Sequence, residues 1–217
     1  SIVALVSVLT AGLVNRYGLA VGIGAGVLAG VVAGLINGVG VAYFRLPPFI
    51  MTLAAMTAYR GAAFIYSSGK PITVESGVAE RFNAIGGGYL LDVVPWPIVY
   101  MLALFVAGHV FLRRTRIGVY VYAIGGGEEA ARLSGLNVRR VKLIVYGLSG
   151  LCSALAAIVL TSRVTVGEPI AGQMYELEAI AATVIGGTSL SGGRGGVWGT
   201  LAGTLILFVL LNIFNIM

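Results

Sequence analysis

The sequence predicts an all-α protein: a polytopic transmembrane helix bundle with about seven helical segments present. Hydrophobic residues make up 58% of the 217 residues, charged residues only 10%, and the mean hydropathy is +0.98. Soluble domains carry about 25% charged residues, so this chain has too few charges to cover a surface that faces water. Its long apolar runs lack the period-two alternation of a membrane barrel, and helices are therefore the predicted spanning elements.

Seven apolar segments follow one another along the chain: residues 2–14, 20–44, 47–67, 96–112, 143–161, 178–190 and 197–216. The first and the sixth are shorter than the roughly 20 residues that a full crossing needs. We interpret the first as a truncated span and the sixth as a half-helix or a helix buried by its neighbours. The whole chain, 1–217, is predicted to be a single transmembrane domain with one large polar loop at 113–142.

The second segment carries a stripe of glycines spaced four residues apart, which places them on one helix face: Gly22, Gly26, Gly30, Gly34 and Gly38. Without side chains, this face lets another helix approach closely. We interpret the stripe as packing within one chain rather than as a dimer seam. Pro47 and Pro48 lack an N–H group and are predicted to separate this helix from the next.

The third segment contains Arg60 well inside its apolar run. An arginine at membrane depth is a candidate functional residue. The alternative is that its long side chain extends to the outer surface, about two turns away. The sequence leaves both interpretations open.

The distribution of basic residues predicts the orientation. Seven of the fourteen Lys and Arg residues fall between the fourth and fifth segments, and basic loops stay in the cytoplasm. The loop 113–142 is therefore predicted to be cytoplasmic, which places 68–95 and 162–177 outside. Arg45 and Arg194 then lie inside, and Arg16 outside is a mild exception.

Several classes of function are disfavoured. The net charge of +6 belongs to membrane orientation rather than nucleic-acid binding, since no basic and aromatic face is visible. Cys152 and His109 each lie alone in apolar runs, so no metal cluster is predicted. No catalytic triad, carboxylate pair or phosphate-binding loop is present, so we predict neither an enzyme nor a directly bound cofactor.

One stretch contrasts with the rest of the chain, the polar and helix-prone residues 125–142. Glu128 and Glu129 favour a helix start through the backbone dipole, and Gly135 is placed to end the helix. A solvated loop helix is one interpretation. The other is a docking element for a soluble partner that drives conformational changes of the membrane bundle.

The residues of this stretch resemble the EAA-then-Gly loop of ATP-binding-cassette (ABC) importer permeases, with the motif positions filled by Glu129, Ala130, Ala131 and Gly135. Three stretches, 46–72, 113–142 and 175–206, are similar to the ribose/xylose/galactose-type branch of these permeases, in its order and spacing. Together they cover more than a third of the chain.

The resemblance implies a bacterial inner-membrane, multi-pass permease subunit that moves a monosaccharide by alternating access. It further implies a dimer of permease subunits, two cytoplasmic ATP-binding subunits and a periplasmic or lipid-anchored sugar-binding protein, with ATP used by the partner. The coupling residues would be Glu128, Glu129, Ala130, Ala131, Arg132 and Gly135. Family members have ten transmembrane helices; two before Ser1 and one after Met217 are missing, so we expect this chain to be a fragment.

Residues in the cargo pathway are less well marked. Sugar recognition combines hydroxyl-bonding and aromatic side chains, and the candidates are Asn37, Phe49, Tyr59, Arg60 and Glu176. Glu176 and Glu178 precede the sixth segment, where acids are expected to cap a helix. The glycine-rich residues 186–196 are predicted to form a tight cytoplasmic turn, with a second contact to the ATP-binding subunit as an alternative. The same machinery for nucleosides or branched-chain amino acids, or a secondary transporter without an ATPase, remains an alternative function.

Overall fold

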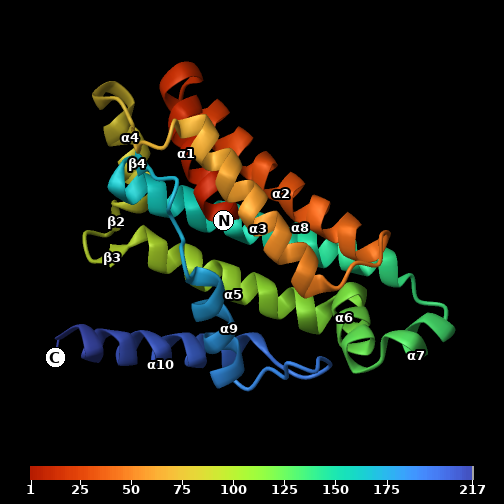
Figure 1. Ribbon diagram of the computed structural model, residues 1–217. Helices are drawn as coiled ribbons and strands as arrows, with labels where there is room; N and C mark the ends of the chain where they lie inside the picture. Colours follow the sequence, from red (N-terminus) through yellow and green to blue (C-terminus); the bar gives the residue numbers. More distant parts are fainter. Residues whose placement is uncertain (217) are drawn as a thin grey trace. The chain divides into compact units, whose positions relative to one another are not determined.

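The computed structural model describes residues 1–216, so Met217 lies outside it, and the described chain is almost entirely helical (Figure 1). Its helices are α1 (Ile2–Tyr17), α2 (Leu19–Ala42), α3 (Pro48–Ser67), α4 (Ser76–Gly86), α5 (Trp96–Arg114), α6 (Arg116–Gly126), α7 (Glu128–Leu133), α8 (Val138–Val164), α9 (Tyr175–Ile185) and α10 (Val197–Ile216). Four two-residue strands complete the list: β1 (Ile72–Thr73), β2 (Tyr89–Leu90), β3 (Val94–Pro95) and β4 (Val166–Gly167). The prediction of an all-α polytopic bundle is confirmed.

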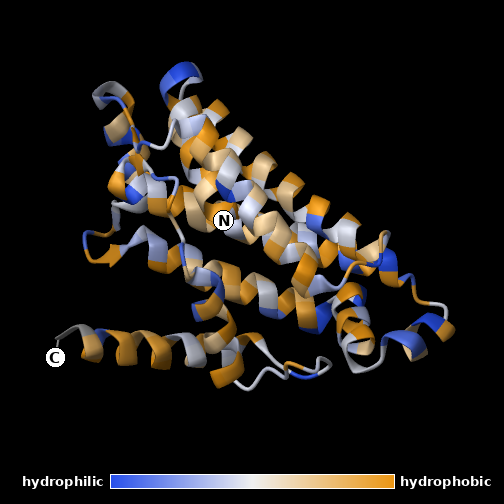
Figure 2. Ribbon diagram, in the orientation of Figure 1, coloured by the Kyte–Doolittle hydropathy of each residue, from blue (hydrophilic) through white to orange (hydrophobic). Residues whose placement is uncertain are grey.

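Every predicted apolar segment contains a helix, and five of these helices are long and apolar enough to cross a membrane: α2, α3, α5, α8 and α10. The two short segments become the short helices α1 and α9, of 16 and 11 residues. The predicted sixth segment, 178–190, was placed too far along the chain, because α9 ends at Ile185 and a glycine-rich turn follows. Figure 2 shows α10 as mostly hydrophobic and α7 with several hydrophilic residues.

The described chain divides into two compact units. Unit 1 contains Ser1–Val99 and Lys142–Gln173, and unit 2 contains Tyr100–Val141 and Met174–Met217. In unit 1, α1 packs against both α2 and α3. In unit 2, α9 packs against α10 and α6 against α7.

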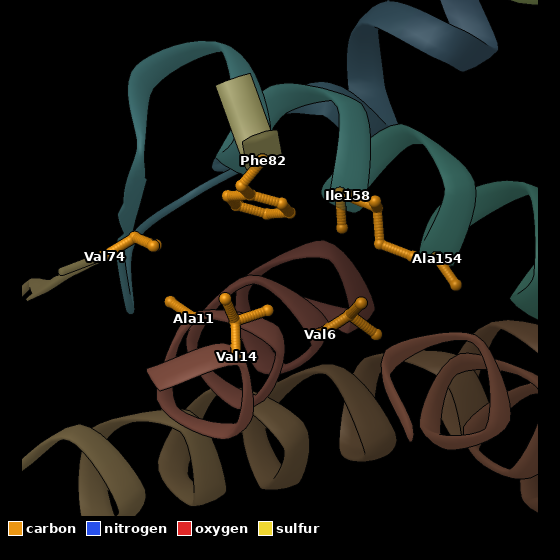
Figure 3. Close-up of a cluster of buried hydrophobic side chains, with 8 residues drawn as sticks. Val6, Ala11, Val14, Val74, Phe82, Ala154 and Ile158 are labelled. Carbon is orange, nitrogen blue, oxygen red and sulfur yellow. The ribbon is translucent and has the colours of Figure 1, made fainter. Parts of the chain in front are cut away.

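The core of unit 1 forms where α4 covers the packed ends of α1 and α8 (Figure 3). Phe82 of α4 is completely buried and lies over Ala11 and Val14 of α1, beside Ile158 of α8. A hydrogen bond of 2.7 Å joins the hydroxyls of Ser7 and Thr161 in this region. Burying a large aromatic side chain stabilises the unit by roughly 1.5–3 kcal/mol.

The two segments predicted to lie outside, 68–95 and 162–177, meet in unit 1. β1 and β4 pair antiparallel, with Ile72 opposite Gly167 and Thr73 opposite Val166. The amide side chain of Asn83 donates to the carbonyl oxygens of Ser162 and Arg163, at 3.3 and 3.1 Å. These bonds bring the two segments together at one end of the unit, as expected for loops on the same side of a membrane.

Candidate functional site

The predicted loop 113–142 contains two helices, of which α6 was not anticipated. Thr115 caps α6, because its hydroxyl accepts a hydrogen bond of 3.1 Å from the backbone N–H of Gly118. A side chain at Gly118 would collide with the backbone of Leu112. The chain therefore turns sharply from α5 into α6, and this turn is possible because residue 118 is glycine.

The polar helix α7 has the two acids in its first turn, as predicted: Glu128 and Glu129. These carboxylates complement the positive end of the helix dipole. Arg132 makes an ion pair of 2.6 Å with Glu129, one turn away. Both side chains are more than half exposed, so this pair adds little to stability, about 0.2–1 kcal/mol.

Gly135 ends α7 in the manner the sequence predicted. Its φ of 82° lies in the left-handed region, where glycine is favoured. The backbone N–H of Gly135 donates to the carbonyl of Arg132 at 3.0 Å, and that of Leu136 donates to the carbonyl of Ala131 at 3.1 Å. This pair of bonds is a Schellman cap, which fixes the direction in which the chain leaves the helix.

Asn137 starts the next helix only four residues after α7 ends. Its side-chain oxygen accepts a hydrogen bond of 3.2 Å from the N–H of Arg140, in the first turn of α8. A capped end of α7 is thus followed directly by a capped start of α8. Such a short connection with both ends fixed transmits a displacement better than a flexible loop does.

The outer surface of α7 combines charge with one large apolar side chain. Ala131 is 5% exposed, whereas Leu133 is 79% exposed and Ala130 is also exposed. Leu133 follows Arg132 on the same short helix as Glu128 and Glu129, so this surface combines an apolar side chain with charges, as protein interfaces do. The arrangement can serve as a small docking surface.

The glycine-rich residues 186–196 lie against α6 within unit 2. The hydroxyl of Tyr122 donates to the carbonyl oxygen of Gly195 at 3.0 Å. A side chain at Gly125 would come within 2.5 Å of the backbone nitrogen of Gly193, so these two backbones touch. The loop 186–196 and the segment carrying α7 are therefore one connected structure, which places both at the same end of unit 2.

The predicted pathway residues are only partly brought together. In unit 1 the Tyr59 hydroxyl donates to the carbonyl oxygen of Ala33 at 2.9 Å and to the side-chain oxygen of Asn37 at 3.3 Å. Phe49 is 73% exposed at the start of α3. Glu176 lies in unit 2, in the first turn of α9 together with Glu178, where acids complement the helix dipole as the sequence predicted.

Arg60 lies one residue beyond Tyr59 and keeps two guanidinium nitrogens, Nε and Nη2, buried without a hydrogen-bond partner among the described residues. This burial favours neither interpretation of Arg60 over the other, because each depends on where the residue lies in a membrane, so both stay predictions. Buried donors of a charged group carry a desolvation cost until an acceptor satisfies them. Arg60 therefore has two buried donors available to an acceptor.

The glycine stripe of α2 packs within unit 1 against two different helices. A side chain at Gly22 or Gly26 would strike Val14 or Thr10 of α1. Side chains at Gly30, Gly34 or Gly38 would strike α8, at Gly150, Tyr146 or Leu143. The stripe is accordingly the surface on which α1 and α8 both approach the α2 backbone.

Sequence reasoning missed two features that the structure supplies. One is the covering helix α4 with Phe82, whose amphipathic pattern was hidden in a loop between strongly apolar segments. The other is Tyr122, whose bond to Gly195 links residues 73 positions apart. The described residues contain no group of three or more His, Cys, Asp or Glu side chains placed to hold a metal ion.

Comparison with known proteins gives a consistent picture. Residues 1–217 match the family described as branched-chain amino acid transport system / permease component. The chain is 49% identical over 218 residues to the ribose import permease protein of Bacillus subtilis, covering 100% of this chain and 67% of that protein. It is 47% identical over 182 residues to the ribose import permease protein of Haemophilus influenzae, covering 83% of this chain and 56% of that protein.

A third relative carries a different sugar in its name. The chain is 43% identical over 218 residues to the L-arabinose transport system permease protein of Escherichia coli, covering 100% of this chain and 65% of that protein. The chain thus spans between 56% and 67% of the length of these three relatives. No solved structure matches it.

Proposed function

Since the chain belongs to the family of permease components of branched-chain amino acid transport systems, we propose that it is the membrane-spanning subunit of an ABC importer of monosaccharides in the inner (plasma) membrane. The observation that carries the proposal is α7. It is a short charged helix, capped at its C-terminal end, with an exposed leucine, in a chain that otherwise has little polar surface.

The partner that uses ATP docks on α7 in this proposal. Two cytoplasmic ATP-binding subunits hydrolyse ATP, and each contacts one permease subunit of a dimer. Glu129 and Arg132 present opposite charges side by side, and Leu133 supplies the apolar anchor. Interfaces concentrate binding energy in such buried anchors while charged rims set orientation.

Movement then passes along the chain. The Schellman cap at Gly135 and the Asn137 cap leave a short, constrained link between α7 and α8. α8 in turn touches the α2 backbone at Gly30 and Gly34, where there is no side chain to absorb a displacement. A shift of α7 is thereby coupled to the membrane helices, and the bundle alternates between outward and inward access.

The relatives support a monosaccharide as cargo, because their names assign ribose and L-arabinose to them. Tyr59, Asn37 and the unpartnered nitrogens of Arg60 are the candidate contacts to sugar hydroxyls in this chain. A periplasmic or lipid-anchored binding protein delivers the sugar to the side where 68–95 and 162–177 meet. Nucleosides and branched-chain amino acids are the competing cargoes.

A pull-down of the full-length permease from detergent, followed by identification of the retained subunits, tests the proposal. We expect an ATP-binding subunit to be retained by the wild type and lost in Glu129→Lys. For ATPase retention, Glu80→Lys is the matched control, since it reverses the charge of an exposed glutamate on α4, away from α7. Retention of the ATPase in Glu129→Lys, together with unchanged sugar uptake, would remove α7 from the mechanism. Absence of any ATPase in the wild type would favour a secondary transporter.

A further inference from the structure

Unit 2 contains a cleft of about 200 Å³ that the transport mechanism does not use. Its walls come from the last turns of α5, from Tyr122 of α6 and from the first turn of α10. The lining residues are His109, Leu112, Arg113, Tyr122, Gly196, Val197, Trp198 and Gly199. Aromatic, cationic and backbone groups therefore face one small space.

The position of the cleft along its helices defines its depth in a membrane. α5 ends at Arg114 and α10 begins at Val197, and both helices are long and apolar enough to cross a bilayer. The ends of spanning helices lie at the level of the lipid headgroups. Trp198 and Tyr122 are the residue types that gather at this level, where an aromatic ring meets both lipid and water.

The chemistry of the lining fits an anion. Arg113 contributes a permanent positive charge and planar N–H donors suited to a phosphate group. The first backbone N–H groups of α10 have no acceptor within the helix, and the helix dipole adds positive potential there. Arg114 and Arg116 follow immediately and increase the positive charge on the side predicted to be cytoplasmic.

The His109 and Trp198 rings shape the apolar part of the cleft. Their centroids lie 5.7 Å apart with the planes tilted by 53°. A wall of this kind accommodates the glycerol and upper acyl region of a lipid, while Arg113 reaches its phosphate. Basic pockets between spanning helices on the cytoplasmic side are sites where lipid headgroups bind.

We propose that this cleft binds the headgroup of an anionic phospholipid of the cytoplasmic leaflet, with Arg113 on the phosphate and Trp198 beside the glycerol region. Through Tyr122, which also holds Gly195, the bound lipid stabilises the glycine loop that lies against α6. The residues that line the cleft include none of the candidate sugar contacts and no residue of α7.

Tryptophan fluorescence tests the proposal directly, because this chain has only two tryptophans, Trp96 and Trp198. The full-length permease is prepared with Trp198 as its single tryptophan, the others being replaced by phenylalanine. It is reconstituted, both alone and assembled with partner subunits whose tryptophans are likewise replaced, into phosphatidylcholine vesicles that carry a small fraction of brominated lipid. Quenching by brominated phosphatidylglycerol is compared with quenching by brominated phosphatidylcholine.

We expect brominated phosphatidylglycerol to be preferred about fivefold, the value for one basic side chain at an anionic lipid. Arg113→Gln should abolish the preference, and Arg113→Lys should keep most of it and show that the protein is folded. Arg140→Gln is the matched control, since it removes a cation near the same surface that does not line the cleft.

Three results would overturn the assignment. Equal quenching by the two lipids, or an unchanged preference in Arg113→Gln, would show that the cleft does not select an anionic lipid. Loss of the preference on adding millimolar inorganic phosphate would assign the cleft to the free ion. If Trp198 is shielded from quenching by both brominated lipids in the assembled complex but not in the permease alone, the cleft is covered by a protein partner. None of these results depends on whether the cargo is a sugar.

Discussion

Tyr122 donates its hydroxyl to the carbonyl oxygen of Gly195 across 3.0 Å, joining α6 to a loop 73 residues later. The same two segments touch at Gly125 and Gly193, where neither residue has a side chain to keep the backbones apart. The helix that leads into α7 is thus braced by the turn between α9 and α10. The sequence did not predict these two contacts. They restrict the movement of α6 and therefore of α7, which follows it.

Tyr122→Phe should loosen the glycine loop without unfolding the protein. Loss of one hydrogen bond of ordinary strength, about 1 kcal/mol, corresponds to roughly fivefold faster local opening. Hydrogen exchange of the backbone amides between Ser189 and Gly196 measures this opening. Tyr120→Phe, on the same helix but without a bond to the loop, should leave the exchange unchanged; equal effects of both variants would contradict the role of the Tyr122 bond.

The Glu129–Arg132 ion pair is expected to matter for docking and not for the stability of α7. Exposed pairs contribute about 0.2–1 kcal/mol, so Glu129→Gln should change the thermal unfolding temperature very little. The swapped pair, Glu129→Arg with Arg132→Glu, preserves the attraction within α7 but exchanges the charges that a partner meets. We expect this double variant to unfold at a slightly lower temperature than the wild type, since the reversed charges oppose the helix dipole, and to lose the ATP-binding subunit in a pull-down. Normal retention of the ATP-binding subunit would show that the surface charges of α7 do not contribute to binding of this partner.

Gly34→Ala should destabilise unit 1, because the added methyl group would strike the carbonyl oxygen of Tyr146 and the backbone of Gly150. Backbone atoms cannot rotate away, so we expect a loss of about 1–3 kcal/mol in the free energy of unfolding. Gly24→Ala lies on the same helix with open space around it and gains helix propensity, so it should be neutral or slightly stabilising. Thermal unfolding of the two variants in detergent makes the comparison. Equal stability would mean that α2 and α8 are not in direct contact.

Arg60→Met should separate stability from transport. The buried Nε and Nη2 nitrogens have no partner among the described residues, so replacing the side chain with an apolar one of similar length should leave stability unchanged or raise it by about 1 kcal/mol. If the guanidinium binds cargo hydroxyls, sugar uptake by the assembled importer should fall by about tenfold or more, the loss of one hydrogen bond to a charged donor. Arg60→Lys, which keeps the charge, should be intermediate. Wild-type uptake in Arg60→Met would remove Arg60 from the pathway.

Tyr59→Phe tests the polar contact between α2 and α3. The variant loses the hydroxyl that donates to Ala33 and Asn37, and it leaves the side-chain oxygen of Asn37 without this donor. We expect a loss of about 1–2 kcal/mol in the free energy of unfolding, measured in detergent. Thr57→Val is a suitable control, because the Thr57 hydroxyl bonds only within its own helix, to Ala54. If Tyr59→Phe lowers the free energy of unfolding no more than Thr57→Val does, the interhelical hydrogen bond contributes nothing to stability.

Composition alone predicts the class of this protein, because composition is a property of the whole chain. Charged residues are too few to cover a surface in water, and the apolar runs have the length of membrane helices, so a bundle of spanning helices follows from solvation alone. The polar helix was equally visible. Its start at Glu128 and its end at Gly135 depend on local backbone chemistry, and the Schellman cap forms as predicted.

Which faces of these helices meet became clear from the folded chain and not from its sequence. The spacing of the α2 glycines predicted close packing, but not that Gly22 and Gly26 contact α1 while Gly30, Gly34 and Gly38 contact α8. Likewise, Phe82 lies in a loop-like stretch and becomes the fully buried cover of the core only when α1 and α8 come together beneath it. Periodicity specifies a face, whereas the partner of that face depends on contacts between residues far apart in the chain, such as Tyr122 with Gly195, which local propensity does not encode.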